Sequence, residues 1–171
     1  VWRRSAPHLG DIGLGWGVPT DGKGVGREFA MGVGIAAAIG IPGIGVYLGA
    51  RALGLAVNVV PTALDAHWWT VPVLVLWALR AGIGEEVIVV GYLFNRLRSL
   101  GWKPWIIVGT AALLRGTYHL YQGFGGFVGN IAMGVVLGAL YLWKGRLAPL
   151  IVAHVLIDAA VFVGYPFVVN A

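Results

Sequence analysis

The chain has 171 residues, of which 58% are hydrophobic and only 11% are charged. Soluble domains average about 25% charged and about 45–50% apolar residues, so this composition excludes an ordinary water-soluble fold. The net charge of +5 could indicate nucleic-acid binding. However, the basic residues cluster between apolar segments, as membrane topology requires, and we expect no nucleic-acid partner. The absence of cysteine excludes disulfides and thiolate metal sites.

Long continuous apolar segments indicate membrane helices, because backbone polar groups surrounded by lipid must be paired within the protein. A membrane β-barrel would instead need short segments of alternating polarity. The sequence therefore predicts an all-α, polytopic transmembrane bundle with about five spans. The second span is expected to be interrupted at Gly82 and Gly84. The predicted spans cover about residues 29–49, 68–97, 105–121, 125–143 and 148–169.

The predicted organisation has two parts, a polar cytoplasmic juxtamembrane segment at 1–28 and a transmembrane domain at 29–171. This topology places nine Lys and Arg residues on the cytoplasmic side and only Arg51 on the opposite side. That asymmetry follows the positive-inside rule, and the basic side is expected to contact anionic membrane lipids. Because the first residue is Val1 rather than Met, we expect further spans to precede this sequence.

Ionisable side chains within the predicted spans define the candidate site. A charge at the centre of a membrane helix costs about 2.5–3.5 kcal/mol on insertion scales, so its presence indicates a function. Arg80 lies near Glu85 and could pair with it or extend towards the membrane surface. The remaining residues form three groups on three spans: Glu85 with Glu86, Arg115 with His119, and His154 with Asp158.

The two adjacent glutamates must have different surroundings. Their side chains point about 100° apart on a helix, so they cannot share one task. One could face a cavity as a general base while the other binds a metal or an arginine. The alternative is that Glu85 and Glu86 are surface carboxylates at a helix end.

The other two groups have a four-residue spacing, which places both side chains on one helical face. Arg115 could neutralise a glutamate of the second span, and His119 could bind a metal or position water. Alternatively, His119 is only a hydrogen-bonded packing residue. Asp158 could fix the tautomer of His154 or bind a metal directly, unless the two form a self-contained polar pair.

Neutral imidazoles and carboxylates are ligands that zinc accepts, and catalytic zinc needs about three of them plus a water position. We expect a zinc site formed by Glu85, His119 and His154. No H-E-x-x-H motif is present, so separate helices would have to assemble this site. Straight helices would place the three residues at depths of roughly 16, 21 and 9 Å, and helix tilt would have to absorb the difference.

The three groups resemble motifs of the CPBP family, also called Abi. It comprises type II CAAX prenyl endopeptidases and bacteriocin-processing or immunity proteins. The family carries E-E-x-x-x-R, then F-x-x-x-H, then H-x-x-x-N or H-x-x-x-D on successive membrane helices. The resemblance covers about residues 68–165, and the matching residues are Glu85, Glu86, His119, His154 and Asp158.

The resemblance implies an intramembrane endopeptidase that hydrolyses a peptide bond. It implies that Glu85 and His119 activate the attacking water, and that Glu86 belongs to the same catalytic set. His154 and Asp158 would bind metal or stabilise the oxyanion. A zinc-dependent and a glutamate-activated mechanism both fit. The implied substrate is a peptide or protein that could carry a lipid, and we expect an integral protein of a bacterial plasma membrane.

Two positions depart from the family pattern. Val90 stands where the family has its arginine, and Arg115 stands where it has its phenylalanine. We hypothesise that the cation has moved to another helix and that Arg115 pairs with Glu86. Without such a relocation, the alternative is a non-catalytic immunity or scaffold protein of the same fold. A transporter or proton relay is a third possibility, which the lack of internal repeats disfavours.

Overall fold

The computed structural model describes residues 22–55 and 67–169, with side chains described for 24–55 and 67–164. These residues contain helices and turns and no strand, which confirms the predicted all-α fold. A π-helical turn, η2 (Glu86–Tyr92), joins α2 to α3, and a 3-10 turn, η3 (Leu120–Gln122), precedes α5. The α-helices are α1 (Gly22–Ala52), α2 (Thr70–Glu85), α3 (Leu93–Ser99), α4 (Pro104–Tyr118), α5 (Gly123–Lys144) and α6 (Ala148–Val169).

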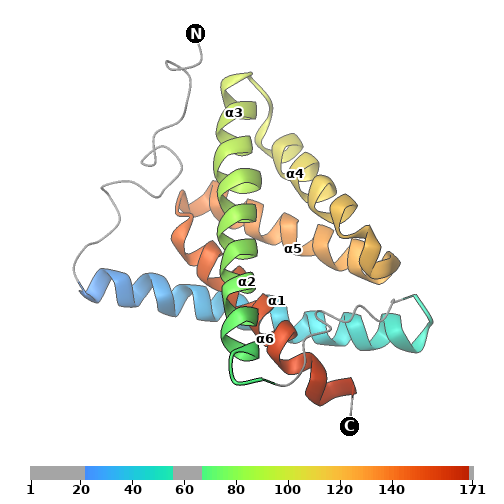
Figure 1. Ribbon diagram of the computed structural model, residues 1–171. Coiled ribbons are helices and arrows are strands. Elements are labelled where there is room, and N and C mark those ends of the chain that lie inside the picture. The colour runs from blue at the N-terminus through green and yellow to red at the C-terminus, as the bar shows by residue number, and fades with distance from the viewer. Residues whose placement is uncertain (1–21, 56–66, 170–171) are drawn as a thin grey trace.

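The helices are arranged around one long column formed by α2, η2 and α3 (Figure 1). Helix α6 packs against both α1 and α2, and α4 and α5 pack against each other, with α5 crossing the column to reach α6 (Figure 1). The hydrophobic core fills the space between η2, α3, α4, α5 and the start of α6. Its most buried members, each at most 2% exposed, are Val90, Phe94, Ile107, Leu137, Leu147 and Leu150.

Two helical segments of the described chain are long and apolar enough to cross a membrane, Gly24–Ala52 and Leu120–Lys144. The apolar segment Ala148–Gly164 is shorter, and α4 has 15 residues where a span needs roughly 20. The column of α2, η2 and α3 is interrupted by the charges of Arg80, Glu85 and Glu86. By length and composition the described bundle therefore contains two candidate spans, together with helices that are shorter or more polar.

The ends of the first span differ from the prediction. Helix α1 begins at Gly22, so residues 22–28 of the predicted juxtamembrane segment are already helical. Residues 1–21 lie outside the described part of the chain. The helix also continues through Pro42 to Ala52. An ion pair of 3.0 Å joins Arg146 Nη2 to Glu28 Oε1 and holds the start of α1 beside the α5–α6 turn, as the predicted topology requires.

The predicted interruption of the second span at Gly82 and Gly84 is wrong. Helix α2 is continuous through both glycines, and the irregular turn, η2, begins only at Glu86. Gly82 permits close helix packing instead, because a Cβ atom there would lie 2.6 Å from Val155 Cγ2 of α6. The glycine therefore brings α2 and α6 together, and the helix does not break there.

A similar contact between α4 and α5 predicts the effect of a small substitution. An ideal Cβ at Gly134 would lie 2.9 Å from the Cα of Ala112, so Gly134→Ala forces backbone to move. We expect this variant to lose about 1–3 kcal/mol of stability, seen as a lower thermal midpoint in detergent. Gly129→Ala on the same helix is the matched control, because its new Cβ meets nothing within 4 Å. That control should be neutral or gain up to about 1 kcal/mol from helix propensity. Equal midpoints for the two variants would contradict the close contact.

Candidate functional site

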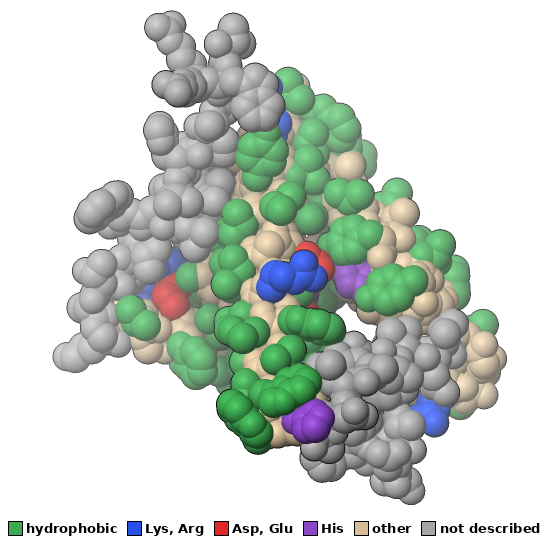
Figure 2. Space-filling view, viewed as in Figure 1, with side chains coloured by type: hydrophobic (Ala, Val, Ile, Leu, Met, Phe, Trp, Pro, Cys, Tyr) green, Lys and Arg blue, Asp and Glu red, His purple; other side chains and the backbone are tan. Residues whose placement is uncertain are grey.

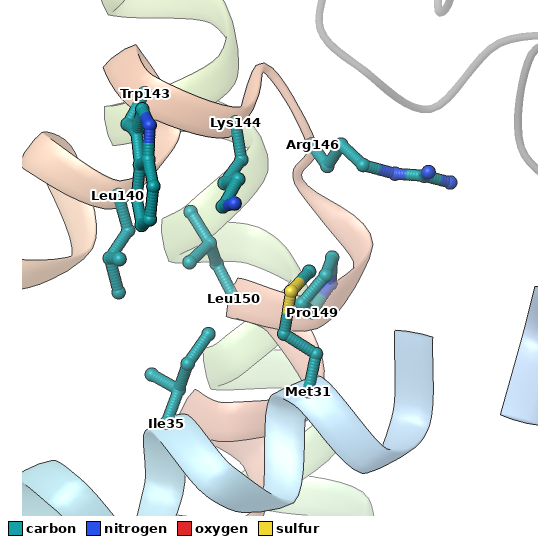
Figure 3. A pocket seen from close by; sticks show the side chains of 8 residues that line it. All are labelled: Met31, Ile35, Leu140, Trp143, Lys144, Arg146, Pro149 and Leu150. Atoms are coloured by element: carbon teal, nitrogen blue, oxygen red, sulfur yellow. The ribbon is translucent and has the colours of Figure 1, made fainter. Parts of the chain in front are cut away.

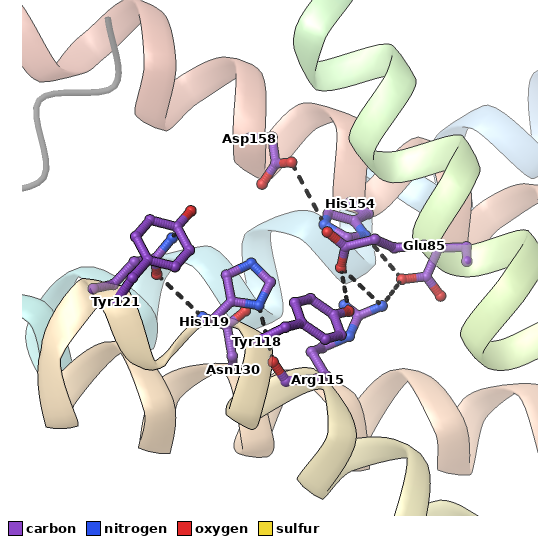
Figure 4. A network of polar contacts seen from close by, with 10 residues as sticks. Glu85, Arg115, Tyr118, His119, Tyr121, Asn130, His154 and Asp158 are labelled. Carbon is purple, nitrogen blue, oxygen red and sulfur yellow. Dashed lines mark hydrogen bonds and ion pairs between the residues drawn. The ribbon is translucent and has the colours of Figure 1, made fainter.

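The six ionisable residues singled out in the sequence lie together where α2, α4 and α6 face one another (Figure 4). The second span contributes the two glutamates at the α2–η2 junction. Helix α4 contributes its last turn and the residue that follows it, and α6 contributes two residues one turn apart. The six residues are Glu85, Glu86, Arg115, His119, His154 and Asp158.

Glu86 is the centre of this network. Its side chain is fully buried, and its Oε1 accepts hydrogen bonds from Arg115 Nη2 and, at 2.8 Å, from His154 Nδ1. Arg115 is itself only 1% exposed. Burying a charge is costly unless it is paired and hydrogen-bonded, which this contact provides. The hypothesis that Arg115 pairs with Glu86 is confirmed, and the alternative of two surface carboxylates is excluded.

The π-helical turn accounts for the local geometry of the glutamates. Glu86 is the first residue of η2, where the chain makes a wider turn with backbone bonds from residue i to i+5. Single π turns inside α-helices frequently mark functional sites. Val90, which occupies the position of the family's arginine, lies in the same turn and is 2% exposed within the hydrophobic core.

Glu85 has different surroundings from its neighbour. Its side chain is 23% exposed, and its Oε2 accepts a hydrogen bond of 2.6 Å from the hydroxyl of Tyr118. The guanidinium of Arg115 lies 3.9 Å away, close enough to attract the carboxylate without a direct hydrogen bond. Glu85 is thus held in place but open to a small molecule, whereas Glu86 is enclosed. The expected difference between the two carboxylates is confirmed.

His119 follows the last turn of α4 and caps it. Its Nδ1 lies 3.0 Å from the backbone carbonyl oxygen of Arg115. A carbonyl oxygen only accepts hydrogen bonds, so Nδ1 carries the proton, and Nε2 is then the basic nitrogen of the neutral ring. The ring centroid lies 4.7 Å from that of Tyr118, and Figure 4 shows the ring across from His154 and Asp158.

His154 is held from both sides of its ring. Nδ1 faces Glu86 at 2.8 Å, and Nε2 lies 3.5 Å from Asp158 Oδ2. Because His154 also contacts Glu86, the alternative of a self-contained His154–Asp158 pair is wrong. The imidazole is 3% exposed, and the Asp158 side chain is 22% exposed. Two carboxylates therefore fix the orientation of one imidazole.

Arg80 takes no part in this network. The residue is exposed on α2, and no carboxylate of the described residues lies within 4.0 Å of it. The possible pair between Arg80 and Glu85 is therefore absent. Figure 2 shows basic, acidic and histidine side chains close together on the face where α2 and α4 meet. The polar network thus reaches the molecular surface there.

The arrangement does not fit a zinc ion. Within residues 24–55 and 67–164, no three His, Cys, Asp or Glu side chains are grouped so that they could hold a metal. Of the three predicted ligands, His154 directs Nδ1 at Glu86. Glu85 lies beside the cation of Arg115, which would repel a second cation at the same oxygens. Zinc at this site stays a prediction.

Sequence reasoning missed Tyr118. Its hydroxyl donates to Glu85, so it belongs to the site, although it is an ordinary aromatic residue in a membrane helix. The available signal was its position directly before His119 and three residues after Arg115.

A second polar contact ties η3 to α5, since Asn130 Nδ2 donates to Gln122 Oε1 at 3.3 Å. That contact supports the turn that follows His119.

Comparison with known proteins identifies the family. Residues 67–160, more than half of the chain, match the family model for the Rce1-like type II CAAX prenyl endopeptidases. The chain belongs to the Rce1-like family. The Rce1-like region begins just before α2, ends within α6 and includes all six residues of the network. It agrees closely with the region of about 68–165 that the motifs predicted. Searches of curated proteins and of solved structures found no significant match.

Membership of the Rce1-like family indicates the location of the protein and its general class of activity. The family is membrane-embedded, and the two helices able to cross a membrane agree with an integral membrane location. The family also implies a protease that acts on a peptide or protein. The predicted membrane hydrolase is confirmed at this level.

Proposed function

We propose that this chain is an intramembrane endopeptidase of the CAAX prenyl protease type, in which Glu85 and His119 activate water. The contrast between the two glutamates carries this proposal. Glu86 is buried and bound to Arg115 and His154, so it is suited to positioning other groups. Glu85 is partly exposed and has one hydrogen-bond partner among the described side chains, Tyr118. Glu85 is therefore the carboxylate that can take a proton from water.

The chemistry follows from the orientation of these groups. Water bound between the Glu85 carboxylate and His119 Nε2 gives one proton to Glu85, and its oxygen adds to the carbonyl carbon of the scissile peptide bond. The C–N bond then breaks as Glu85 passes the proton to the leaving nitrogen. Because Nδ1 of His154 donates to Glu86, this histidine can stabilise the developing oxyanion only through an Nε2–H, which would exchange its 3.5 Å contact with Asp158 for that bond. No external oxidant or further reactant is required.

The buried ion pair of Glu86 and Arg115 holds the proposed catalytic groups in position. The Glu86 carboxylate bonds to both Arg115 and His154, so it links α4 and α6 to the helix that carries Glu85. Electrostatic stabilisation is most effective when donors are preorganised in a site that excludes water. On this proposal, Arg115, Glu86 and Tyr118 are positioning residues. The proposed substrate is a peptide that could be lipidated, and the proposed location is a bacterial plasma membrane.

A cleavage assay tests the proposal. The chain is reconstituted in liposomes and offered a farnesylated peptide and the same peptide without the lipid, with products identified by mass spectrometry in ¹⁸O-labelled water. We expect one ¹⁸O atom in the acyl product of a single cleaved bond. Cleavage of neither peptide by a folded chain would favour the non-catalytic alternative.

The same preparation tests the zinc prediction. Because the described residues do not group three ligands, we expect no stoichiometric zinc in the detergent-purified chain and unchanged cleavage after chelation. The comparison protein is the His119→Ala/His154→Ala double variant. Near-stoichiometric zinc in the wild type that disappears in this variant would restore the predicted zinc site and contradict the metal-free mechanism.

A further inference from the structure

A second candidate site lies away from the polar network, in a cavity of about 150 Å³ between α1, α5 and the start of α6 (Figure 3). None of the six ionisable residues of the network lines it. Its wall is apolar except at the end of α5 and in the turn that follows. The apolar lining residues are Met31, Ile35, Leu140, Trp143, Pro149 and Leu150.

Two basic side chains complete the lining of this cavity. Lys144, the last residue of α5, is exposed, and its Nζ lies 3.6 Å from the centroid of the Trp143 ring. Figure 3 shows the Lys144 side chain directed towards Leu150 and Pro149. Arg146 follows in the turn and is paired with Glu28 of α1. No carboxylate of the described residues lies within 4.0 Å of the Lys144 ammonium, so this charge is available to a ligand.

We propose that this cavity holds a segment of one acyl chain of an anionic phospholipid whose phosphate contacts Lys144. The charges and polarity of the lining favour this ligand. The cavity is apolar, and it is bordered by the Lys144 ammonium, which has no carboxylate partner among the described residues. The sequence predicts this side to be cytoplasmic. Basic pockets between membrane helices on that side are suited to anionic headgroups. Trp143, which is 73% exposed, is a residue type that favours the headgroup level.

The apolar lining favours a lipid over a peptide. A peptide would bring backbone N–H and C=O groups, which are costly to bury without partners. Apart from the indole N–H of Trp143, the apolar lining side chains offer no such partners, whereas an acyl chain needs none. The site is separate from the Glu85 network, so this proposal does not depend on the proposed proteolytic activity.

Lipid retention in native mass spectrometry tests the site. The detergent-purified chain is mixed with dioleoyl phosphatidylglycerol or dioleoyl phosphatidylcholine, and the fraction that keeps one lipid is measured. We expect phosphatidylglycerol to be retained in preference to phosphatidylcholine. Lys144→Gln should lower its affinity about fivefold, the equivalent of about 1 kcal/mol per basic residue. Lys103→Gln is the matched control, an exposed lysine on the same predicted side but outside the cavity. It should leave retention unchanged.

A second pair of variants tests the acyl-chain part. Ile35→Trp places bulk in the cavity and should reduce retention, whereas Ile41→Trp changes a residue of α1 that is 70% exposed and outside the lining. Equal losses for Lys144→Gln and Lys103→Gln would indicate diffuse surface attraction and overturn the site. Equal retention of the two lipids would overturn it as well, as would full retention by Ile35→Trp.

Discussion

Glu85→Gln is expected to reduce peptide cleavage by about 10²–10⁴-fold, the usual contribution of a general base. The amide has nearly the same volume and can still accept the hydrogen bond from Tyr118, but it cannot take a proton from water. The loss should therefore appear in the initial cleavage rate in liposomes. Because Glu85 is 23% exposed, the thermal midpoint in detergent should change little.

The adjacent carboxylate supplies a matched comparison. Glu86→Gln makes the same carboxylate-to-amide change at the next residue. However, it alters a fully buried group that binds both Arg115 and His154. It should lower the thermal midpoint as well as the rate, because a buried cation loses its counter-charge. A Glu85→Gln variant with nearly full activity would show that the base is another residue. A midpoint as low as that of Glu86→Gln would show that Glu85 is mainly structural.

The composition of the site could be predicted from the sequence, because charged residues in membrane helices are rare and need partners. That rule identified the six residues and a pair between Arg115 and a glutamate of the second span, and the departures from the family pattern pointed to Glu86. The sequence did not predict that these residues lie close together in space. Straight helices separate His119 from His154 by roughly 12 Å in depth, but the helices cross at wide angles and bring both residues to one place (Figure 1, Figure 4).

The errors along the second span also have a physical cause. Glycine lowers helix propensity by about 1 kcal/mol, so a break at Gly82 and Gly84 was expected. Propensity is a weak local signal, and the contact between Gly82 and Val155 overrides it. The π turn at Glu86 has no compositional signature, because its residues are those of an ordinary apolar helix. Tyr118 was missed for the same reason.

The hypothesis that the family's cation has moved to Arg115 predicts the second large effect. Arg115→Phe restores the family's residue at that position but leaves Glu86 buried without a cation, which should cost about 3–5 kcal/mol and abolish cleavage. Adding Val90→Arg returns a cation to the family's own position, four residues after Glu86 in η2. We expect this double variant to recover measurable cleavage in liposomes, while its thermal midpoint stays below that of the wild type, because Val90 is 2% exposed within the hydrophobic core.

The matched control for this rescue is Arg115→Phe combined with Val89→Arg. Val89 is also buried, at 7% exposure, but its side chain points away from that of Val90 along the helix and cannot supply the same contact. Arg115→Met combined with Glu86→Gln removes both charges and should regain stability without the cation. Recovery by the Val90→Arg combination alone would show that the site needs a cation beside Glu86 whichever helix carries it. If the Val90→Arg combination folds but stays inactive, or if Val89→Arg rescues equally well, the relocation hypothesis is wrong, and Arg115 has a role that the family's arginine does not share.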